Sequence, residues 1–285
     1  ARFYDYRDQH ISFKQNIAAG TISKLLISDA SVKKIVQPYS SAGGRQKETN
    51  DHFYVRVSER LRHKNRGVSM WDYERLVLEA FSGIYKVKCI NHTELIETTL
   101  SGQTVYTDNE LKPGGVVIVA IPDLRNKNAY DPQRPYTSLG VLSDIRKYLY
   151  RHISPHVRLD VRNPRFEEIQ LSFSVKFIAE ENEFYEKQLK TEIEQFLAPW
   201  AYDHGHDIEF GGKISKSVLI NFIEERPYVD YLSCVKMYQI VEGVKSSDVE
   251  EVIATSARSV FVSVKPDDPL NAHDIKFLTT ADCIC

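Results

Sequence analysis

The chain has 285 residues, of which 37 are basic and 39 are acidic, so its formal net charge is −2. At roughly 100–200 residues per domain, this length predicts two domains or one large domain, either able to bury a sizeable core. The balanced charge lacks the excess of cations with which a dedicated nucleic-acid binder neutralises phosphates. The longest apolar run, Val116 to Ile121, is far shorter than the ~20 residues of a membrane-spanning helix. We therefore expect no nucleic-acid ligand and no membrane span.

The start of the chain and its cysteines indicate how the protein is processed and in which compartment it folds. The chain begins without a methionine and without the basic and then apolar stretch of a secretory signal, so we interpret it as a processed chain or as part of a longer protein. Four cysteines do not form the dense, regular framework of a secreted scaffold, which favours a reducing, cytoplasmic origin. Cys89 and Cys234 have apolar neighbours and are predicted to be small core residues.

The first 49 residues mix short apolar runs with a polar, glycine-containing stretch. This composition predicts a β-rich or irregular lead-in, which we interpret as the remnant of a larger N-terminal region. Asn50 is a candidate N-cap, and apolar residues then recur at four-residue spacing at Phe53, Val57 and Leu61. The spacing favours a helix, although Phe53 could instead begin a strand.

The segment from Ser69 to Gly83 has the clearest helical pattern. Ser69 stands three residues before Asp72, as in a capping box, and the apolar residues that follow keep helical spacing until Gly83 ends the helix. Residues Ile84 to Ile90 then alternate as a half-buried strand. A polar, glycine-containing connection leads to residues 116–121, which are apolar at every position and predict a central strand covered on both faces.

A stretch without periodicity comes next. Arg125 to Pro135 contains two prolines and predicts a surface loop. Ser138 is predicted to cap a helix that reaches about His152, and Val157 to Arg162 is predicted to form a short strand.

The strictest alternation in the chain runs from Glu168 to Phe177 and predicts a long strand with one solvent face. A predicted helix follows to about Leu197, where Pro199 ends it. Ser215 is predicted to cap a further helix, and the strand after it is predicted from Tyr228 to Tyr238. Strands are also predicted at residues 259–264 and 272–280.

These elements predict an α+β fold: two α/β sandwich-like units with helices packed on mostly antiparallel sheets, plus β-rich N-terminal and C-terminal segments. The predicted division is a lead-in at residues 1–49, a first unit at 50–163, a second unit at 164–243 and a C-terminal β-containing extension at 244–285.

The search for catalytic chemistry finds one tight group of ligand-type side chains, His204, His206 and Asp207. Two imidazoles and a carboxylate can hold a divalent metal, which makes a metal-dependent hydrolase the alternative hypothesis. Their spacing is not that of a helical ligand pair, and Gly205 is typical of a loop tip. No nucleophile elbow and no His-Glu-x-x-His pair occurs, so we expect no enzyme, no metal and no cofactor.

The densest positive charge lies in the predicted helix after Asn50. Its members are Arg56, Arg60, Arg62, Lys64 and Arg66. A nucleic-acid-binding module that uses this run is a third hypothesis, but on a helix these positions spread over more than one face. We favour a solvated or subunit-facing surface, and add two loop tyrosines, Tyr130 and Tyr136, as predicted interface residues.

Gly43-Gly44-Arg45 through Glu48, followed by Arg56 to Glu74, resembles the opening segment of baseplate J-like proteins. In that family a Gly-Gly loop leads to a charged helix that ends in an Arg-(small)-x-(Ser/Thr)-x-x-Asp-Tyr-Glu turn. The likeness extends over about Gly43 to Tyr238. Its later parts are Gly114 to Val119, the long strand after Asn163-Pro164, and the segments Ile214 to Leu219 and Tyr228 to Tyr231.

The resemblance implies a structural wedge subunit in the baseplate of a contractile injection machine: a phage tail, a phage-tail-like particle or a type VI secretion apparatus. It implies that the chain links hub, neighbouring wedges and sheath and relays the contraction trigger. The implied partners are other wedge subunits, hub and sheath proteins in a hetero- and homo-oligomeric assembly. The implied place of assembly is the bacterial cytoplasm.

Overall fold

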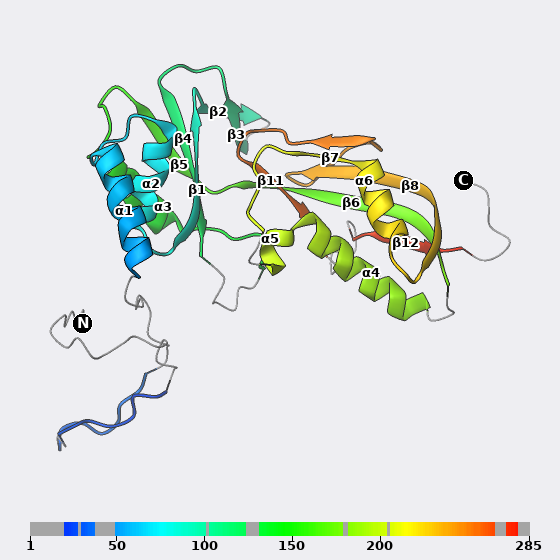
Figure 1. Cartoon of the computed structure of the whole chain (residues 1–285), viewed down its shortest axis with the longest axis horizontal. Helices are drawn as coiled ribbons and strands as arrows, with labels where there is room; N and C mark the ends of the chain where they lie inside the picture. Colours follow the sequence, from blue (N-terminus) through cyan, green and yellow to red (C-terminus); the bar gives the residue numbers. More distant parts are fainter. Residues whose placement is uncertain are drawn as a thin grey trace. The chain divides into compact units, whose positions relative to one another are not determined.

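The structure is a computed structural model that describes residues 20–27, 30–37, 49–100, 103–123, 131–178, 182–203, 206–265 and 272–278, with the side chains of 97–100 and 103–106 left out. The chain divides into two compact units, residues 1–65 and 66–285 (Figure 1). The boundary falls within the segment that the sequence predicts as one unit, and the four-part division stays a prediction.

The first unit contains the helix α1 (Asn50–His63). Its N-cap is Thr49, whose hydroxyl accepts a hydrogen bond from the His52 N–H at 3.3 Å, so the prediction that Asn50 is the cap is wrong by one residue. The helix ends at Lys64, which adopts a left-handed conformation with φ 50°. Residues 20–27 and 30–37 contain no strand, so this described part of the lead-in is irregular.

The first sheet of the second unit has the order β1-β4-β5, formed by β1 (Ile84–Asn91), β4 (Gly115–Pro122) and β5 (Arg158–Arg162). β4 is antiparallel to β1 and parallel to β5. Helices α2 (Met70–Ala80) and α3 (Leu139–Leu149) pack on one face of this sheet. Val87 and Cys89 of β1 point toward these helices, as the sequence predicts. Tyr85, which the alternation places on the same face, packs instead with Ile121 and Ile208 on the other face, because the strand register shifts between Ile84 and Lys86.

The predicted caps of the two helices beside this sheet are both confirmed. The Ser69 hydroxyl accepts from the Asp72 N–H, and the Asp72 carboxylate accepts from the Ser69 N–H at 2.7 Å, which completes the capping box. Ser138 caps α3 by accepting from the Val141 N–H at 3.4 Å.

The central position of β4 is also confirmed. Ile118 and Ala120 face α2 and α3, whereas Val117 and Val119 face the opposite side and pack against Phe210. A strand covered on both faces must be apolar at every position, which is the pattern that the sequence shows.

The polar connection predicted before β4 is in fact a hairpin, so that prediction is wrong. β2 (Glu94–Leu100) pairs with β3 (Gln103–Asn109) in an antiparallel ladder. The Arg258 guanidinium ties the base of the hairpin to the rest of the unit, because its Nε lies 2.9 and 3.0 Å from the two carboxylate oxygens of Asp108. Polar side chains on both strands hide this hairpin from an analysis of hydrophobic periodicity.

The second sheet is built around β6 (Arg165–Phe177). β8 (Val229–Val241) is antiparallel to it along one edge and continues into β9 (Val244–Lys245). β11 (Ser259–Ser263) and β12 (Asp274–Phe277) are both parallel to β6 and follow one another along its other edge.

Helices α4 (Asn182–Leu197) and α6 (Lys216–Glu224) cover this sheet and bury apolar residues of β6. Pro199 ends α4 as predicted, but it also begins the short helix α5 (Pro199–Tyr202). Ser215 holds the N-cap position of α6, yet its side chain makes no capping hydrogen bond, so the prediction of a serine cap is only positionally right.

A small two-stranded sheet lies beside α6. β7 (Lys213–Ser215) pairs with β10 (Glu251–Ile253) in antiparallel fashion. The fully buried carboxylate of Glu167 on β6 anchors the chain after β10, since it accepts from the Thr255 N–H at 3.0 Å and from Gln239 Nε2 at 2.6 Å.

The predicted α+β class is thus confirmed, with helices on sheets that combine antiparallel and parallel pairs. Cys89 is a free thiol buried in the first core, as predicted, whereas Cys234 is half-buried and disulfide-bonded, so its interpretation as a small core residue is wrong. In the described part of the chain, every helix is too short or too polar to cross a lipid bilayer.

Candidate interaction surface

Three of the five predicted basic interface residues lie in helix α1, and a fourth lies at its C-cap. Arg56 and Arg60 are one turn apart and lie on the same side of the helix, and Lys64 follows four residues later at the C-cap. Arg62 lies on a different side, so the structure does not gather all of them on one face. Arg60, Arg62 and Lys64 are exposed and Arg56 is half-buried. Positive charge at the last turn also stabilises the helix by opposing its dipole.

An apolar stripe runs beside this basic row. Phe53, Tyr54 and Leu61 are 44%, 67% and 70% exposed and lie on one side of α1, together with half-buried Val57. The Arg56 guanidinium lies over the Phe53 ring at 5.5 Å from its centroid. An exposed apolar stripe next to cations is typical of a surface that contacts another protein.

The other predicted interface residues are not on this helix. Arg66 is the first residue of the second unit and is exposed. Tyr136 is 61% exposed, and its ring meets the Phe166 ring edge-on at 5.3 Å. Tyr130 and most of the loop predicted at Arg125 to Pro135 lie outside the described residues.

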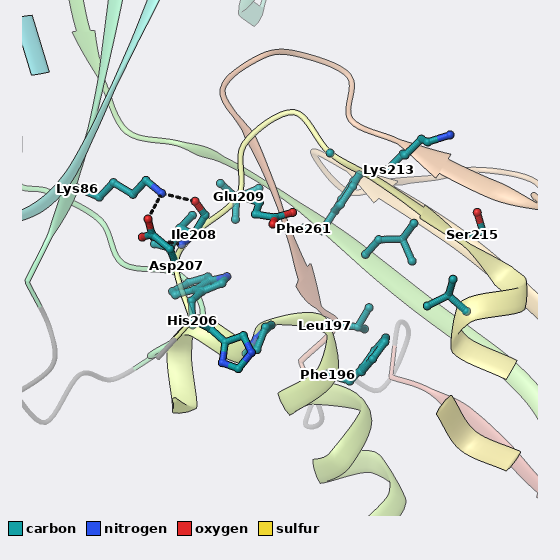
Figure 2. Close-up of a pocket in the computed structure, with 16 residues that line it drawn as sticks. Lys86, Phe196, Leu197, His206, Asp207, Ile208, Glu209, Lys213, Ser215 and Phe261 are labelled. Carbon is teal, nitrogen blue, oxygen red and sulfur yellow. Dashed lines mark hydrogen bonds and ion pairs between the residues drawn. The ribbon is translucent and has the colours of Figure 1, made fainter. Parts of the chain in front are cut away.

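The second unit contains a groove of about 650 Å³. Its walls are α4 and α5 on one side and β7 with the start of α6 on the other, with β11 between them (Figure 2). Apolar side chains make up most of the lining, namely Phe196, Leu197, Pro199, Trp200, Ile208, Ile214, Val218, Val260 and Phe261.

One end of the groove is held by an ion pair between distant parts of the sequence. Lys86 on β1 donates to the Asp207 carboxylate at 2.7 Å and to the Ile208 carbonyl oxygen at 2.6 Å (Figure 2). The Tyr85 hydroxyl donates to the same carboxylate at 3.0 Å. Desolvation raises the pKa of Asp207, but the hydrogen bonds from Lys86 and Tyr85 outweigh it and lower this pKa below its ordinary value.

The candidate metal ligands meet other groups in the structure. Asp207 is engaged by Lys86, and His206 Nδ1 lies 2.9 Å from the Asp203 carboxylate. His204 lies outside the described residues. Among the residues that are described, no three His, Cys, Asp or Glu side chains converge in a way that could hold a metal ion. The geometry therefore gives the hydrolase hypothesis no support.

The groove and the role of Lys86 are not predictable from the sequence. The alternation of β1 predicts Lys86 on a wet face, and 121 positions separate it from Asp207. No local pattern reports a contact over such a separation. Trp200 also lines the groove, and its position there depends on the packing of α4 against the second sheet.

The chain matches a family of known proteins and is similar to solved structures. A sequence model of the family "Baseplate protein PVC11-like" matches residues 7–266. A chain in the structure described as "Cryo-EM structure of the anti-feeding prophage (AFP) baseplate, 6-fold symmetrised" is similar in fold, with a TM-score of 0.58 and 19% sequence identity. That match covers 93% of this chain and 52% of the other, so this chain spans about half the length of its structural relative. No curated protein matches the chain.

Proposed function

Because the chain belongs to the PVC11-like family of baseplate proteins, we propose that it is a structural wedge subunit in the baseplate of a contractile injection machine. The observation that carries the proposal is the extent of the family match, which includes both units and leaves only the ends of the chain outside. The prediction of a baseplate protein is thereby confirmed, and its finer parts belong to this proposal. These are the likeness to baseplate J-like proteins, the wedge position and the place of assembly in the bacterial cytoplasm.

The proposed role is mechanical. The subunit links the hub, neighbouring wedges and sheath, and its contacts switch from one packing to another when contraction is triggered. Two features support a contact role: the basic and apolar surface of α1, and the groove of the second unit. The similar fold in the baseplate of the anti-feeding prophage makes a phage-tail-like particle our first choice of machine.

Purification of intact particles from the native host tests this proposal. A tagged chain is expected to co-purify with sheath, hub and other baseplate proteins, and deletion of its gene is expected to leave tubes and sheaths without complete baseplates in electron micrographs. Complete, contractile particles in the deletion strain would contradict the proposal.

The contribution of the α1 surface can be separated from that of the whole chain. Reversing charge with Arg56→Glu and Arg60→Glu is expected to reduce co-purification, since both residues border the apolar stripe. Lys147→Glu is the matched control, because Lys147 is exposed on α3 of the other unit and pairs only loosely with Asp144 at 3.7 Å. Equal recovery of all three forms would remove α1 from the proposed contact surfaces.

The metal-dependent hydrolase hypothesis is tested on the same material. His206→Ala is expected to leave metal content, measured by elemental analysis of the purified chain, and particle assembly unchanged. Stoichiometric transition metal that is lost in His206→Ala would overturn the non-catalytic part of the proposal.

A further inference from the structure

Among the residues that the structure describes, the strand β7 pairs along one of its edges, with β10. Next to the β7–β10 ladder, the Gly212 carbonyl accepts from the Ala254 N–H at 3.1 Å, and the Lys216 N–H donates to the Glu250 carbonyl at 2.8 Å. Hydrogen-bonded pairs in an antiparallel ladder alternate with non-bonded pairs. The residues between Gly212 and Lys216 therefore alternate between the paired edge and the opposite edge.

This alternation determines which backbone groups of β7 are not hydrogen-bonded to β10. Ile214, opposite Val252, faces β10, so the N–H and C=O of Lys213 and the N–H of Ser215 point to the other edge. Within the described residues, no hydrogen bond to these three groups is found. An edge of this kind is a template for an added strand.

The free edge of β7 borders the groove. Residues 212–215 all line the groove, whereas no residue of β10 does, so the groove lies on the unpaired side of β7. Across the groove lie Phe196 and Leu197 of α4, and Phe261 lies between the two walls (Figure 2). The groove thus offers main-chain hydrogen bonds along one side and apolar contacts along the floor and the other side.

Two of the charged pairs around the groove are closed ion pairs, whereas the Glu209 carboxylate is not part of one within the described residues. Lys86 pairs with Asp207 at 2.7 Å, and Lys213 pairs with Glu251 at 3.0 Å. Glu209 is exposed at the rim and makes no ion pair within the described part of the chain. The complementary occupant is therefore an extended, apolar segment with a positive charge.

The chain itself contains such a segment, Thr21 to Ile27, which forms neither helix nor strand. Leu26 and Ile27 are 102% and 81% exposed, and Ile22 and Leu25 are about half exposed. In an extended conformation, either set of alternate positions turns two large apolar side chains to one side. The one charged residue of the segment is Lys24.

We propose that residues 21–27 of a second copy of this chain dock in the groove as an added strand on β7. Main-chain hydrogen bonds to Lys213 and Ser215 supply affinity, and the apolar floor together with Glu209 selects the segment. The proposal deepens the proposed function, on which it rests for the presence of neighbouring copies. It assigns the contact between copies to one strand pairing, that of residues 21–27 with β7. This pairing is tested on purified chain in the absence of particles.

The first experiment uses Trp200 as a reporter, because it lines the groove and the chain has only two tryptophans. In a Trp71→Phe chain, a synthetic peptide of residues 20–27 is titrated while Trp200 fluorescence is followed. We expect saturable binding, and a loss of at least tenfold in affinity for a peptide that carries Leu25→Asp and Leu26→Asp, since one substitution falls on each face. Absence of a saturable change up to millimolar peptide would overturn the proposal.

A second experiment tests the strand pairing. Lys213→Pro removes the N–H that points to the free edge and leaves the ladder with β10 intact, whereas Lys213→Ala keeps that N–H and loses the same side chain. We expect at least a tenfold loss of peptide affinity for Lys213→Pro and little change for Lys213→Ala. A peptide with N-methylated Lys24 and Leu25 lacks one N–H donor on each of its two edges. It is expected to bind wild-type chain as weakly as the unmodified peptide binds Lys213→Pro, so strand pairing can still be tested if the proline variant does not fold. Equal affinity throughout would refute strand addition.

Charge and oligomeric state complete the test. Glu209→Lys is expected to weaken binding of the peptide severalfold, and a Lys24→Glu peptide is expected to restore it. Full-length chain is expected to self-associate in sedimentation equilibrium, and Lys213→Pro is expected to be less associated. A monomer at every concentration, even one that binds the peptide, would overturn docking between copies, whereas co-purification with baseplate proteins would still support the proposed function.

Discussion

His273 is expected to make the second unit sensitive to acid. The imidazole fills the gap between β11 and β12 along β6, where the Leu171 N–H donates to His273 Nδ1 at 3.0 Å. Nδ1 therefore carries no proton, and Nε2 donates to the Ser263 hydroxyl at 2.9 Å. A proton on Nδ1 would face the Leu171 N–H and break this bond, so the fold requires a neutral ring.

The magnitude follows from the shift in pKa. Burial, with a smaller contribution from the charge of Lys190, lowers the pKa of His273 from 6.5 to about 4. Below pH 6.5 the unfolded chain therefore binds a proton that the folded chain excludes, and this part of the stability is lost as pH falls toward 4. At about 1.36 kcal/mol per pKa unit, His273 alone costs roughly 2.5 kcal/mol between pH 7 and pH 4.5.

The assay compares wild type with His273→Gln, which keeps an acceptor for the Leu171 N–H but does not titrate. Urea unfolding at pH 7 and pH 4.5, followed by Trp200 fluorescence in a Trp71→Phe background, measures how much stability each form loses. Wild type is expected to lose about 2.5 kcal/mol more than His273→Gln, because the carboxylates common to both forms cancel. Equal losses would show that His273 takes up a proton in the folded chain and would refute the reasoning.

Three further changes test the packing of the second unit by urea unfolding at pH 7. Gly115→Ala places a Cβ against the Thr93 carbonyl oxygen and is expected to cost about 1–3 kcal/mol of the free energy of unfolding. A Cβ at Gly83 meets nothing within 4 Å, so an equal cost for Gly83→Ala would refute the clash. Asp108→Asn leaves Arg258, whose side chain is 13% exposed, without its carboxylate, and is expected to cost about 3 kcal/mol and to speed hydrogen exchange in β2 and β3. Arg158→Ala, at a side chain that is 53% exposed, is the control and is expected to cost under about 1 kcal/mol. Unchanged exchange in the hairpin would mean that Asp108 does not anchor it. Glu167→Gln turns an amide N–H₂ toward the Thr255 N–H or toward Gln239, so that two donors face each other, and is expected to cost about 1–3 kcal/mol. Unaltered stability would show that the hydrogen bonds accepted by the buried Glu167 carboxylate do not stabilise the fold.

The elements that local sequence predicts well are those whose pattern is set by one buried face. The capping box of Ser69 and Asp72, the stripe of α3 and the alternation of β6 all appear in the structure close to their predicted bounds. Each reflects a preference that acts within a few residues, either a cap that satisfies free N–H groups or a side-chain periodicity that faces a core. The α+β class follows from the order of these elements.

The interface residues were less accessible to such reasoning. The sequence identifies the basic run of α1 and predicts that it spreads over more than one face of a helix, but it does not show that Arg66 begins another unit. The unit boundary decides that position. The metal hypothesis fails to gain support for a similar reason, because the partner of Asp207 is Lys86 on β1.

Sequence by itself thus determined which segments are helix or strand wherever a single amphipathic face marks them, and the family match rests on that same order of residues. Only the tertiary structure decided that β2 and β3 form a hairpin, that β11 and β12 share one edge of β6, and that a groove lies beside the unpaired edge of β7. Periodicity reports the environment of a residue along its own element. Pairing between strands depends on backbone groups that every residue carries, so it leaves little trace in the side chains and becomes definite only when distant segments pack together.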